Sequence, residues 1–211
     1  MIKKLYILFK LGRKLAKSDA LSIFTKFHNP PIGIKILFYL LSLSFSKKDN
    51  SFVNETEGER LSNSLQSMGT TFIKLGQFLA TRPDIIGEKL SKQLESLQDR
   101  LPPFELSKAK EIIKKDLGED NFNSIINLSE PVAAASIAQV HKAQINDNGT
   151  IKDVAIKILR PNIKKIFNEE IDALMLFAFL TESIIKKTKR LKLVEVVYLL
   201  KEITNLEMDL R

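Results

Sequence analysis

The Asn-Gly dipeptide at positions 148–149 constrains the fold of this 211-residue chain more than any other feature. Asn-Gly readily adopts the positive φ angles of a two-residue hairpin turn. It stands between two segments rich in β-branched residues, Ile137–Ile145 and Ile151–Leu159, which have the composition of strands. The sequence therefore predicts an antiparallel hairpin. A third strand-like segment, Phe122–Asn127, precedes it.

Helical periodicity dominates on both sides of the hairpin, so the predicted class is α+β. One helical region runs from Glu59 to about Leu97 in at least two pieces, because Pro83 disfavours helix at the residue before it. A second helix is expected from Ser107 to Leu117, with Gly118 as its C-cap. Two long helices should follow the hairpin, at about Ile163–Lys187 and Leu193–Leu210.

The basic charge of the chain is concentrated at its start. The net charge of the whole chain is +8. Residues 1–48 hold ten Lys or Arg and one acid, Asp19, so their charge is +9 (10 − 1). The rest of the chain therefore carries −1 (8 − 9). A nucleic-acid-binding domain usually carries its basic patch on the folded module. The distribution therefore favours an anionic membrane surface, with a solubilising basic end as the simpler alternative and nucleic acid as the third.

Met1–Lys17 has the pattern of a basic amphipathic helix, with lysines at helical spacing on one side and Ile2, Leu5 and Phe9 on another. After the breaker Asn29-Pro30-Pro31, the apolar stretch Ile34–Phe45 is well short of the roughly 20 residues that a spanning helix needs. It is expected to be an interfacial or buried helix. Lys47–Gly58 is polar and has the composition of a linker. The chain has no Cys, which excludes disulfides and thiolate metal sites, and no metal site is expected.

Val154-Ala155-Ile156-Lys157 lies on the second strand of the predicted hairpin. Strand side chains alternate between faces, so Val154, Ile156 and Ile158 suit a core while Ala155 and Lys157 share the other face. A small residue beside an ammonium leaves room for a flat ring and offers a contact to phosphates, as in the lysine strand of protein kinases. The alternative is a solvated strand lysine.

A kinase carries a glycine-rich loop before this strand, but here the corresponding stretch is Ala133-Ala134-Ala135-Ser136. Alanine resists positive φ and keeps the backbone farther from a phosphate than glycine does. The segment therefore predicts an unusual phosphate loop, or else a small-residue turn packed under a helix.

Two further features stand out on predicted helices. Lys74 and Gln77 share a face at i, i+3 spacing, and Thr70 extends this polar stripe. Gly76 lies between them, and a helical glycine costs about 1 kcal/mol against alanine, so something is expected to approach the backbone there. A solvated polar face is the alternative reading. On the last predicted helix, Val196, Leu200 and Ile203 form an expected apolar stripe, and Glu207 falls on the same stripe. A carboxylate in that position should be either paired or at a frayed helix end. Asp209 points to another side.

Taken together, these motifs closely resemble the UbiB/ADCK family of atypical kinase-like proteins. The similarity covers about residues 69–211 and includes the hallmark Lys-x-Gly-Gln motif (Lys74, Gly76, Gln77), the alanine-rich loop with its following strand (131–143), the nucleotide lysine motif (154–157) and a Glu-x-Asp motif (Glu207, Asp209). Thr70 stands where the family often has proline, and Leu210 where an aromatic residue is common.

The resemblance implies the N-lobe of a protein-kinase-like fold with the Lys-x-Gly-Gln helices laid over the active site. Lys74 would pair with Glu207 and block peptide substrates. Lys157, with Ala155 beside it, would contact ATP or ADP bound with Mg²⁺, and residues 133–136 would cover the phosphates. The implied role is ubiquinone (coenzyme Q) biosynthesis on the cytoplasmic face of a bacterial inner membrane. Quinone-precursor lipids or ubiquinone-biosynthesis proteins are the implied partners, and the arrangement is compatible with a homodimer.

The predicted organisation is membrane-proximal helices over residues 1–50, a helical Lys-x-Gly-Gln segment over 51–104 and an incomplete N-lobe over 105–211. The C-lobe, with its catalytic-loop Asp and Asn and its metal-binding Asp, is absent from the sequence. This chain alone is therefore expected to be an inactive, truncated UbiB-type kinase or ATPase. The alternative is a non-catalytic, membrane-peripheral scaffold or binding module that partners a separate C-lobe chain.

Overall fold

The structure, a computed structural model, describes residues 2–17, 56–95, 97, 101–147, 149–184 and 186–210. The predicted apolar segment 34–45 and most of the predicted linker 47–58 lie outside the described residues. The chain divides into two compact units. One comprises residues 1–98 and 166–206, and the other comprises residues 99–165 and 207–211. The predicted hairpin and the first predicted long helix after it therefore fall largely in different units.

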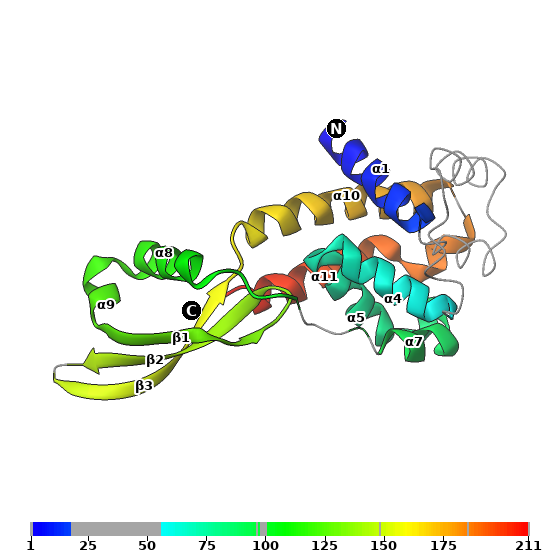
Figure 1. Ribbon diagram of the computed structural model, residues 1–211. Helices are drawn as coiled ribbons and strands as arrows, with labels where there is room; N and C mark the ends of the chain where they lie inside the picture. The colour runs from blue at the N-terminus through cyan, green and yellow to red at the C-terminus, as the bar shows by residue number, and fades with distance from the viewer. Residues whose placement is uncertain are drawn as a thin grey trace. The chain divides into compact units, whose positions relative to one another are not determined.

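The sheet unit is built on three antiparallel strands in the order β1-β2-β3 (Figure 1): β1 (Ile125–Ala134), β2 (Ala138–Asp147) and β3 (Thr150–Leu159). The predicted hairpin is confirmed, because Asp147 and Thr150 form the last pair of the β2–β3 ladder. Gly149 has φ +88° in the turn, and its N–H donates to the Asn146 side-chain oxygen at 2.7 Å. Asn148 is outside the described residues.

The prediction for the first strand was wrong in its bounds. Helix α9 (Glu119–Asn123) takes the start of the predicted segment, and β1 then runs on to Ala134. The register of β1 against β2 shifts on both sides of Pro131. Proline has no N–H to give a ladder and is tolerated on an edge strand at an irregularity, which is where Pro131 lies. The interruption hides the second half of the strand from a periodicity argument.

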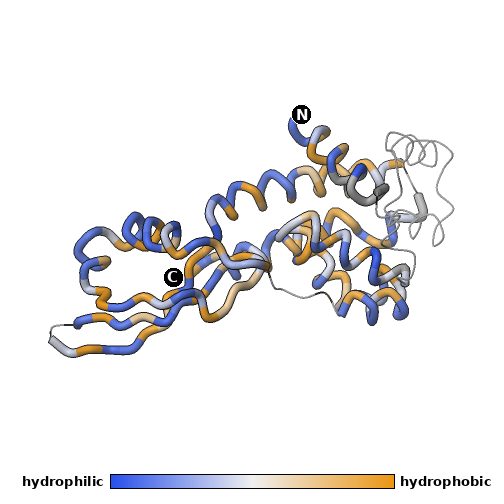
Figure 2. Tube along the Cα trace, in the orientation of Figure 1, coloured by the Kyte–Doolittle hydropathy of each residue, from blue (hydrophilic) through white to orange (hydrophobic). Residues whose placement is uncertain are grey.

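Helix α8 (Leu106–Leu117) covers one face of the sheet (Figure 1). Ala109 and Ile113 on α8 are buried against Ile158, and Ile156 packs beside them. Gly118 ends the helix with φ +83°, as its expected C-cap position required. β3 carries both hydrophilic and hydrophobic residues (Figure 2), and burial alternates along it from Asp153 to Ile158, so one of its faces contributes to this core.

Four short helices follow one another over residues 57–94 of the other unit: α4 (Glu57–Met68), α5 (Thr70–Ala80), α6 (Pro83–Ile86) and α7 (Glu88–Leu94). The predicted break before Pro83 is confirmed. A second break, at Gly69 with φ +107°, was not predicted. Thr56 and Glu59 form a capping box that starts α4, which fixes the end of the predicted linker. The core of this helical group consists of Leu61, Leu65, Met68, Phe72, Leu90 and Leu94.

The same unit holds α1 (Ile2–Lys17) and most of α10 (Ile163–Ile184) and α11 (Leu193–Glu207), which are joined by a 3₁₀ segment, η2 (Lys186–Leu191). Lys3 pairs with Glu169 at 2.6 Å and Lys4 with Asp172 at 2.9 Å, which ties the first turn of α1 to α10. Among the described residues, no helix combines the length and the apolarity needed to span a membrane.

Candidate functional site

The face of the sheet that α8 does not cover carries the predicted nucleotide lysine. Ala133 on β1 and Lys157 on β3 both pair with Val140 on β2, so the three residues form one row across the sheet. Residues paired across antiparallel strands point to the same face. Ala133 and Lys157 are exposed, whereas Gln139 and Ile158, one position along, are buried on the opposite face. The predicted alternation of β3 is therefore confirmed.

Ala155 lies on this open face in the next row of β3, where it pairs with Lys142 of β2. Lys142 is also exposed, and the motif-based reading did not single it out. Within the described part of the chain, no acidic side chain pairs with Lys142 or Lys157. Two positive charges without an internal counterion, beside two methyl groups, give this face the chemistry of a site for an anion with a flat apolar part.

The structure places the four residues of the predicted alanine loop in two different settings. Ala133 and Ala134 belong to β1, and only Ala135 and Ser136 lie in the turn before β2. The turn is closed by the Ala135 N–H, which donates to the Ala138 carbonyl at 2.8 Å. Ser136 is fully buried. The turn is therefore shorter than the sequence suggested.

Arg160, the residue that directly follows β3, holds this turn. Its Nε and Nη2 atoms both donate to the Ala135 carbonyl, at 3.0 and 2.9 Å. The same guanidinium donates to the carbonyls of Pro102 at 3.0 Å and Leu101 at 3.2 Å. A fork of five N–H donors on one rigid plane is the side chain able to bind several carbonyls at once.

A buried polar chain lies beneath the same end of the sheet. The Gln139 amide accepts from the Phe104 N–H at 2.9 Å and donates to the Phe104 carbonyl at 3.1 Å. It also lies 2.9 Å from His141 Nε2, while His141 Nδ1 lies 2.8 Å from the Ser129 carbonyl. Since a carbonyl only accepts, Nδ1 carries the proton, and Nε2 accepts from Gln139. The arrangement fixes the orientation of the His141 ring and attaches Phe104 to the sheet.

The Lys-x-Gly-Gln residues lie on α5, where Lys74 and Gln77 are both half-buried. Thr70 was expected to extend their polar stripe but is buried, because α5 begins at Thr70 directly after the break at Gly69. The expected close approach at Gly76 is confirmed. A Cβ there would lie 2.8 Å from Leu65 Cδ1 and would also clash with Leu97.

The expected apolar stripe of α11 was wrong in one position. The buried residues follow 196, 200, 204 and 208, whereas Ile203 is 40% exposed. A spacing of four keeps these residues on one side of the helix, and Glu207 is the last helical residue and exposed. Asp209 is also exposed.

Lys74 belongs to the helical unit, while Lys157, Glu207 and Asp209 belong to the sheet unit. The pairing of Lys74 with Glu207 therefore stays a prediction, as does the placement of the Lys-x-Gly-Gln helices over the active site. In the described ranges, no three His, Asp or Glu side chains gather as a metal ion would require.

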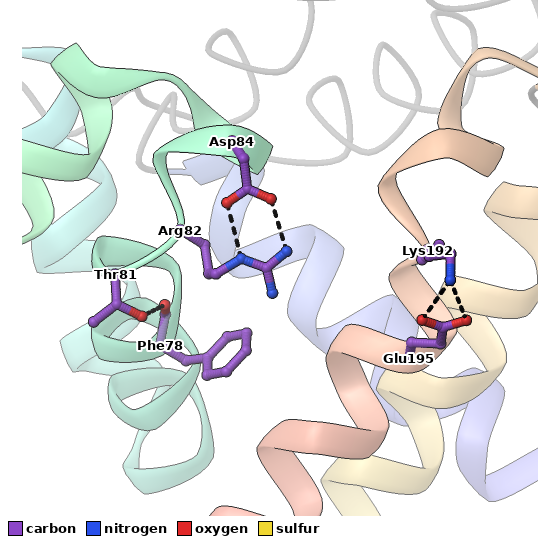
Figure 3. A network of polar contacts seen from close by, with 6 residues as sticks. All are labelled: Phe78, Thr81, Arg82, Asp84, Lys192 and Glu195. Carbon is purple, nitrogen blue, oxygen red and sulfur yellow. Dashed lines mark hydrogen bonds and ion pairs between the residues drawn. The ribbon is translucent and has the colours of Figure 1, made fainter.

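A hollow of about 420 Å³ in the helical unit is lined mainly by charged residues from around the start of α6, the end of η2 and the start of α11. Figure 3 shows its two ion pairs, Arg82 with Asp84 and Lys192 with Glu195. The hydrogen bonds from Arg82 lower the pKa of the Asp84 carboxyl, and those to Asp84 raise the pKa of Arg82. These charges neutralise each other at the surface, and such exposed pairs contribute little stability.

Comparison with known proteins places this geometry in context. Residues 96–211 match the ABC1 atypical kinase-like domain. Over 168 residues, the chain is 37% identical to a protein of Azotobacter vinelandii named probable protein kinase UbiB. The matched region covers 79% of this chain and 30% of that relative. It is 40% identical over 143 residues to the protein of that name from Marinobacter nauticus, covering 67% of this chain and 26% of the relative. The chain thus spans less than a third of the length of these relatives.

Proposed function

Because the chain belongs to the family of ABC1 atypical kinase-like proteins, we propose that it supplies the nucleotide-binding small lobe and the preceding helices of a UbiB-type atypical kinase or ATPase that supports ubiquinone biosynthesis. The observation that carries this proposal is the row Ala133–Val140–Lys157 on the open face of the sheet. It brings an ammonium and a small side chain from two outer strands to one surface. The opposite surface is filled by α8.

In this proposal Lys157 binds the phosphates of ATP or ADP, and Ala155 leaves space for a flat part of the nucleotide. The turn at Ala135 and Ser136 covers the phosphates together with Ala133, while Ala134 pairs with Gln139 and lies on the opposite face. Mg²⁺, when bound with the nucleotide, would neutralise phosphate charge. The described residues fit the phosphate end of the nucleotide, but they do not gather a carboxylate set for the metal.

Lys74 and Gln77 are proposed to form a lid that pairs with Glu207 and Asp209. A lysine paired with a carboxylate at the mouth of the site would exclude peptides and favour a small lipid-like quinone precursor. The half-burial of Lys74 and the exposure of Glu207 both suit such a contact. The proposed partners are therefore quinone-precursor lipids or other proteins of ubiquinone biosynthesis.

Contact with a lipid surface is proposed for α1. Its exposed apolar residues Ile2, Leu5, Tyr6 and Phe9 recur at spacings of three and four, so they form one stripe. Ile7 and Leu8 instead pack on the core of the helical unit. A stripe of this kind can enter the boundary of a bilayer while the remaining lysines meet anionic headgroups. The proposed location is peripheral, on the cytoplasmic face of a bacterial inner membrane.

By itself the chain is proposed to bind nucleotide without turning it over, since the family's catalytic and metal-binding residues lie outside the motifs it contains. A second candidate is a non-catalytic scaffold that partners a separate C-lobe chain. The large exposed apolar residues along α11, among them Leu199, Ile203 and Leu206, favour a protein contact of this type. Steady ATP hydrolysis by the isolated chain with Mg²⁺, abolished by Lys157→Ala, would rule out both the inactive fragment and the scaffold.

The nucleotide site is tested by titrating MgATP and MgADP into the 211-residue chain in a calorimeter. Lys157→Ala should weaken binding by about tenfold or more, the usual effect of losing a charge-assisted contact. Lys152→Ala is the matched control. Lys152 is an exposed lysine on the same strand, but it pairs with Asp147 near the hairpin turn. Equal affinities for both variants would contradict the proposed site.

A further inference from the structure

Arg160 stands immediately after β3, three residues beyond Lys157. Its guanidinium makes four hydrogen bonds to three backbone carbonyls, and none of these acceptors is a carboxylate. These four bonds fix the backbone of the segments that carry the carbonyls, because each donor of the rigid fork holds one peptide group in place. The Arg160 N–H itself donates to the Ile137 carbonyl at 2.9 Å, which fixes the start of the side chain.

The three carbonyls belong to two segments that are distant in sequence. Ala135 lies in the turn proposed to cover the nucleotide. Leu101 and Pro102 lie in the stretch through which the chain passes from the Lys-x-Gly-Gln helices to α8. Pro102 and Pro103 carry no N–H, so at these two residues the carbonyls are the backbone groups that can accept an attachment.

The contact with Ala135 also sets the direction of the next amide. The chain has no cis peptide among its described residues, and in a trans peptide the N–H points opposite to the preceding carbonyl. Because the Ala135 carbonyl points at Arg160, the Ser136 N–H points away from it. A rotation of this peptide would break both bonds from Arg160 to Ala135. The guanidinium therefore holds one orientation of the turn.

We propose that Arg160 is a positioning residue that couples the nucleotide-covering turn to the segment leading from the Lys-x-Gly-Gln helices, so that a ligand which orders the turn also orders residues 101–104. This proposal rests on the proposed function for the identity of the ligand. The coupling itself rests on one side chain shared by Ala135 and by Leu101–Pro102. Lysine could not replace it, since a compact ammonium cannot reach all three carbonyls in the plane of a fork.

The coupling is tested by residue-specific amide hydrogen exchange on the 211-residue chain without nucleotide. The Ala135 amide reports on the turn, and the Phe104 amide reports on the linking segment, where Pro102 and Pro103 have no amide proton. Arg160→Met should accelerate both amides by about tenfold, the effect expected when a charge-assisted hydrogen bond is lost. Lys164→Met removes a nearby exposed positive charge and should change neither. Acceleration of only one amide, or of neither, overturns the proposal.

Addition of MgATP separates coupling from simple stabilisation. In the unchanged chain, MgATP should slow exchange at both Ala135 and Phe104; in Arg160→Met it should slow exchange at Ala135 alone. Equal protection of Phe104 in both proteins overturns the coupling. If MgATP protects neither amide of the unchanged chain, the proposed function fails, while the nucleotide-free comparison still decides the coupling. Should Arg160→Met not fold, Arg160→Lys replaces it, and unchanged exchange at both amides then overturns the proposal.

Discussion

Ala133 and Lys157 face Val140 from the two sides of β2, so a methyl group and an ammonium lie in one row on the uncovered face of the sheet. Two steps between neighbouring strands separate their backbones by about 10 Å. The side chain at 133 is short, and that at 157 is long and can bend across Val140. In the proposed site, the short side chain at 133 leaves space for the nucleotide beside this positive charge.

Filling this space should interfere with a nucleotide without disturbing the fold. Ala133→Leu adds three carbons to an exposed position of β1, so its effect on unfolding should stay within about 0.5 kcal/mol. The crowding should weaken MgATP binding by about tenfold, as overpacking of a contact by 1–3 kcal/mol implies. Calorimetric titration and chemical unfolding measure the two effects. Unchanged MgATP affinity would argue that the phosphate contacts lie elsewhere.

The buried amide of Gln139 should be far more important for stability than other amides of the same strand. Gln139→Leu leaves the Phe104 N–H, the Phe104 carbonyl and His141 Nε2 without their partner. The free energy of unfolding should therefore fall by about 2–4 kcal/mol. Gln144→Leu is the control. The Gln144 amide bonds with Asn127 and Asp153 at exposed positions and should cost within about 0.5 kcal/mol. Similar losses in urea unfolding for both variants would contradict this ranking.

Gly76 is required by packing rather than by backbone conformation. Gly76→Ala gains about 1 kcal/mol of helix propensity but forces a methyl group against Leu65 and Leu97, so a net loss of about 1–2 kcal/mol is expected. The double variant Leu97→Ala/Gly76→Ala should be more stable than the sum of the single changes, since the smaller side chain relieves the clash. Strict additivity in chemical unfolding would show that the two residues do not contact each other.

The capping box of α4 should give stability that depends on pH. The Thr56 N–H donates to the Glu59 carboxylate at 2.7 Å, and this bond lowers the pKa of Glu59 in the folded chain. A lowered pKa means that the stabilisation is complete above the unfolded pKa and is lost as pH falls through the folded pKa. Glu59→Gln should therefore be less stable than the parent at neutral pH and equal to it in acid. A stability difference that persists in acid would point to lost packing instead.

The exposed stripe of α1 should control attachment to lipid. Phe9→Asp removes apolar burial worth about 1.5–3 kcal/mol and should lower sedimentation with phosphatidylglycerol–phosphatidylethanolamine vesicles by about tenfold or more. Phe179→Asp on α10 is the control, since Phe179 is also an exposed phenylalanine, at 60%. An equal loss in both variants would mean that no single stripe makes the contact, and undiminished binding of Phe9→Asp would remove α1 from the membrane proposal.

The sequence identified the elements whose signal is local. Asn-Gly, the β-branched run of β3, Pro83 and Gly118 each act within a few residues, and the hairpin, the break and the cap were all confirmed. Signals that depend on distant contacts were missed or misread. Thr70 has a polar side chain, but the break at Gly69 turns it inward. The second half of β1 was hidden because Pro131 interrupts its alternation.

Only part of the candidate site could be predicted from the sequence, because the rest also depends on distant contacts. Ala155 and Lys157 are two apart on one strand, so their shared face follows from alternation alone. The place of Ala133 in their row depends on the shifted register at Pro131, which no local pattern reveals. Arg160 and Gln139 form hydrogen bonds with backbone groups of residues 101–104. Backbone groups are common to nearly all residue types, so the sequence does not indicate which of them a side chain will bind. An arginine directly after a strand was the one available hint.

The first turn of α1 changes how the charge of the leading segment should be counted. Lys3 and Lys4 already have counterions in Glu169 and Asp172 of α10, so an anionic surface must compete with carboxylates of the chain itself for them. Exposed pairs of this kind weaken as ionic strength rises. Added salt should therefore loosen the helix from α10 at the same time as it screens the lipid, and the two effects would oppose each other in any salt titration of attachment.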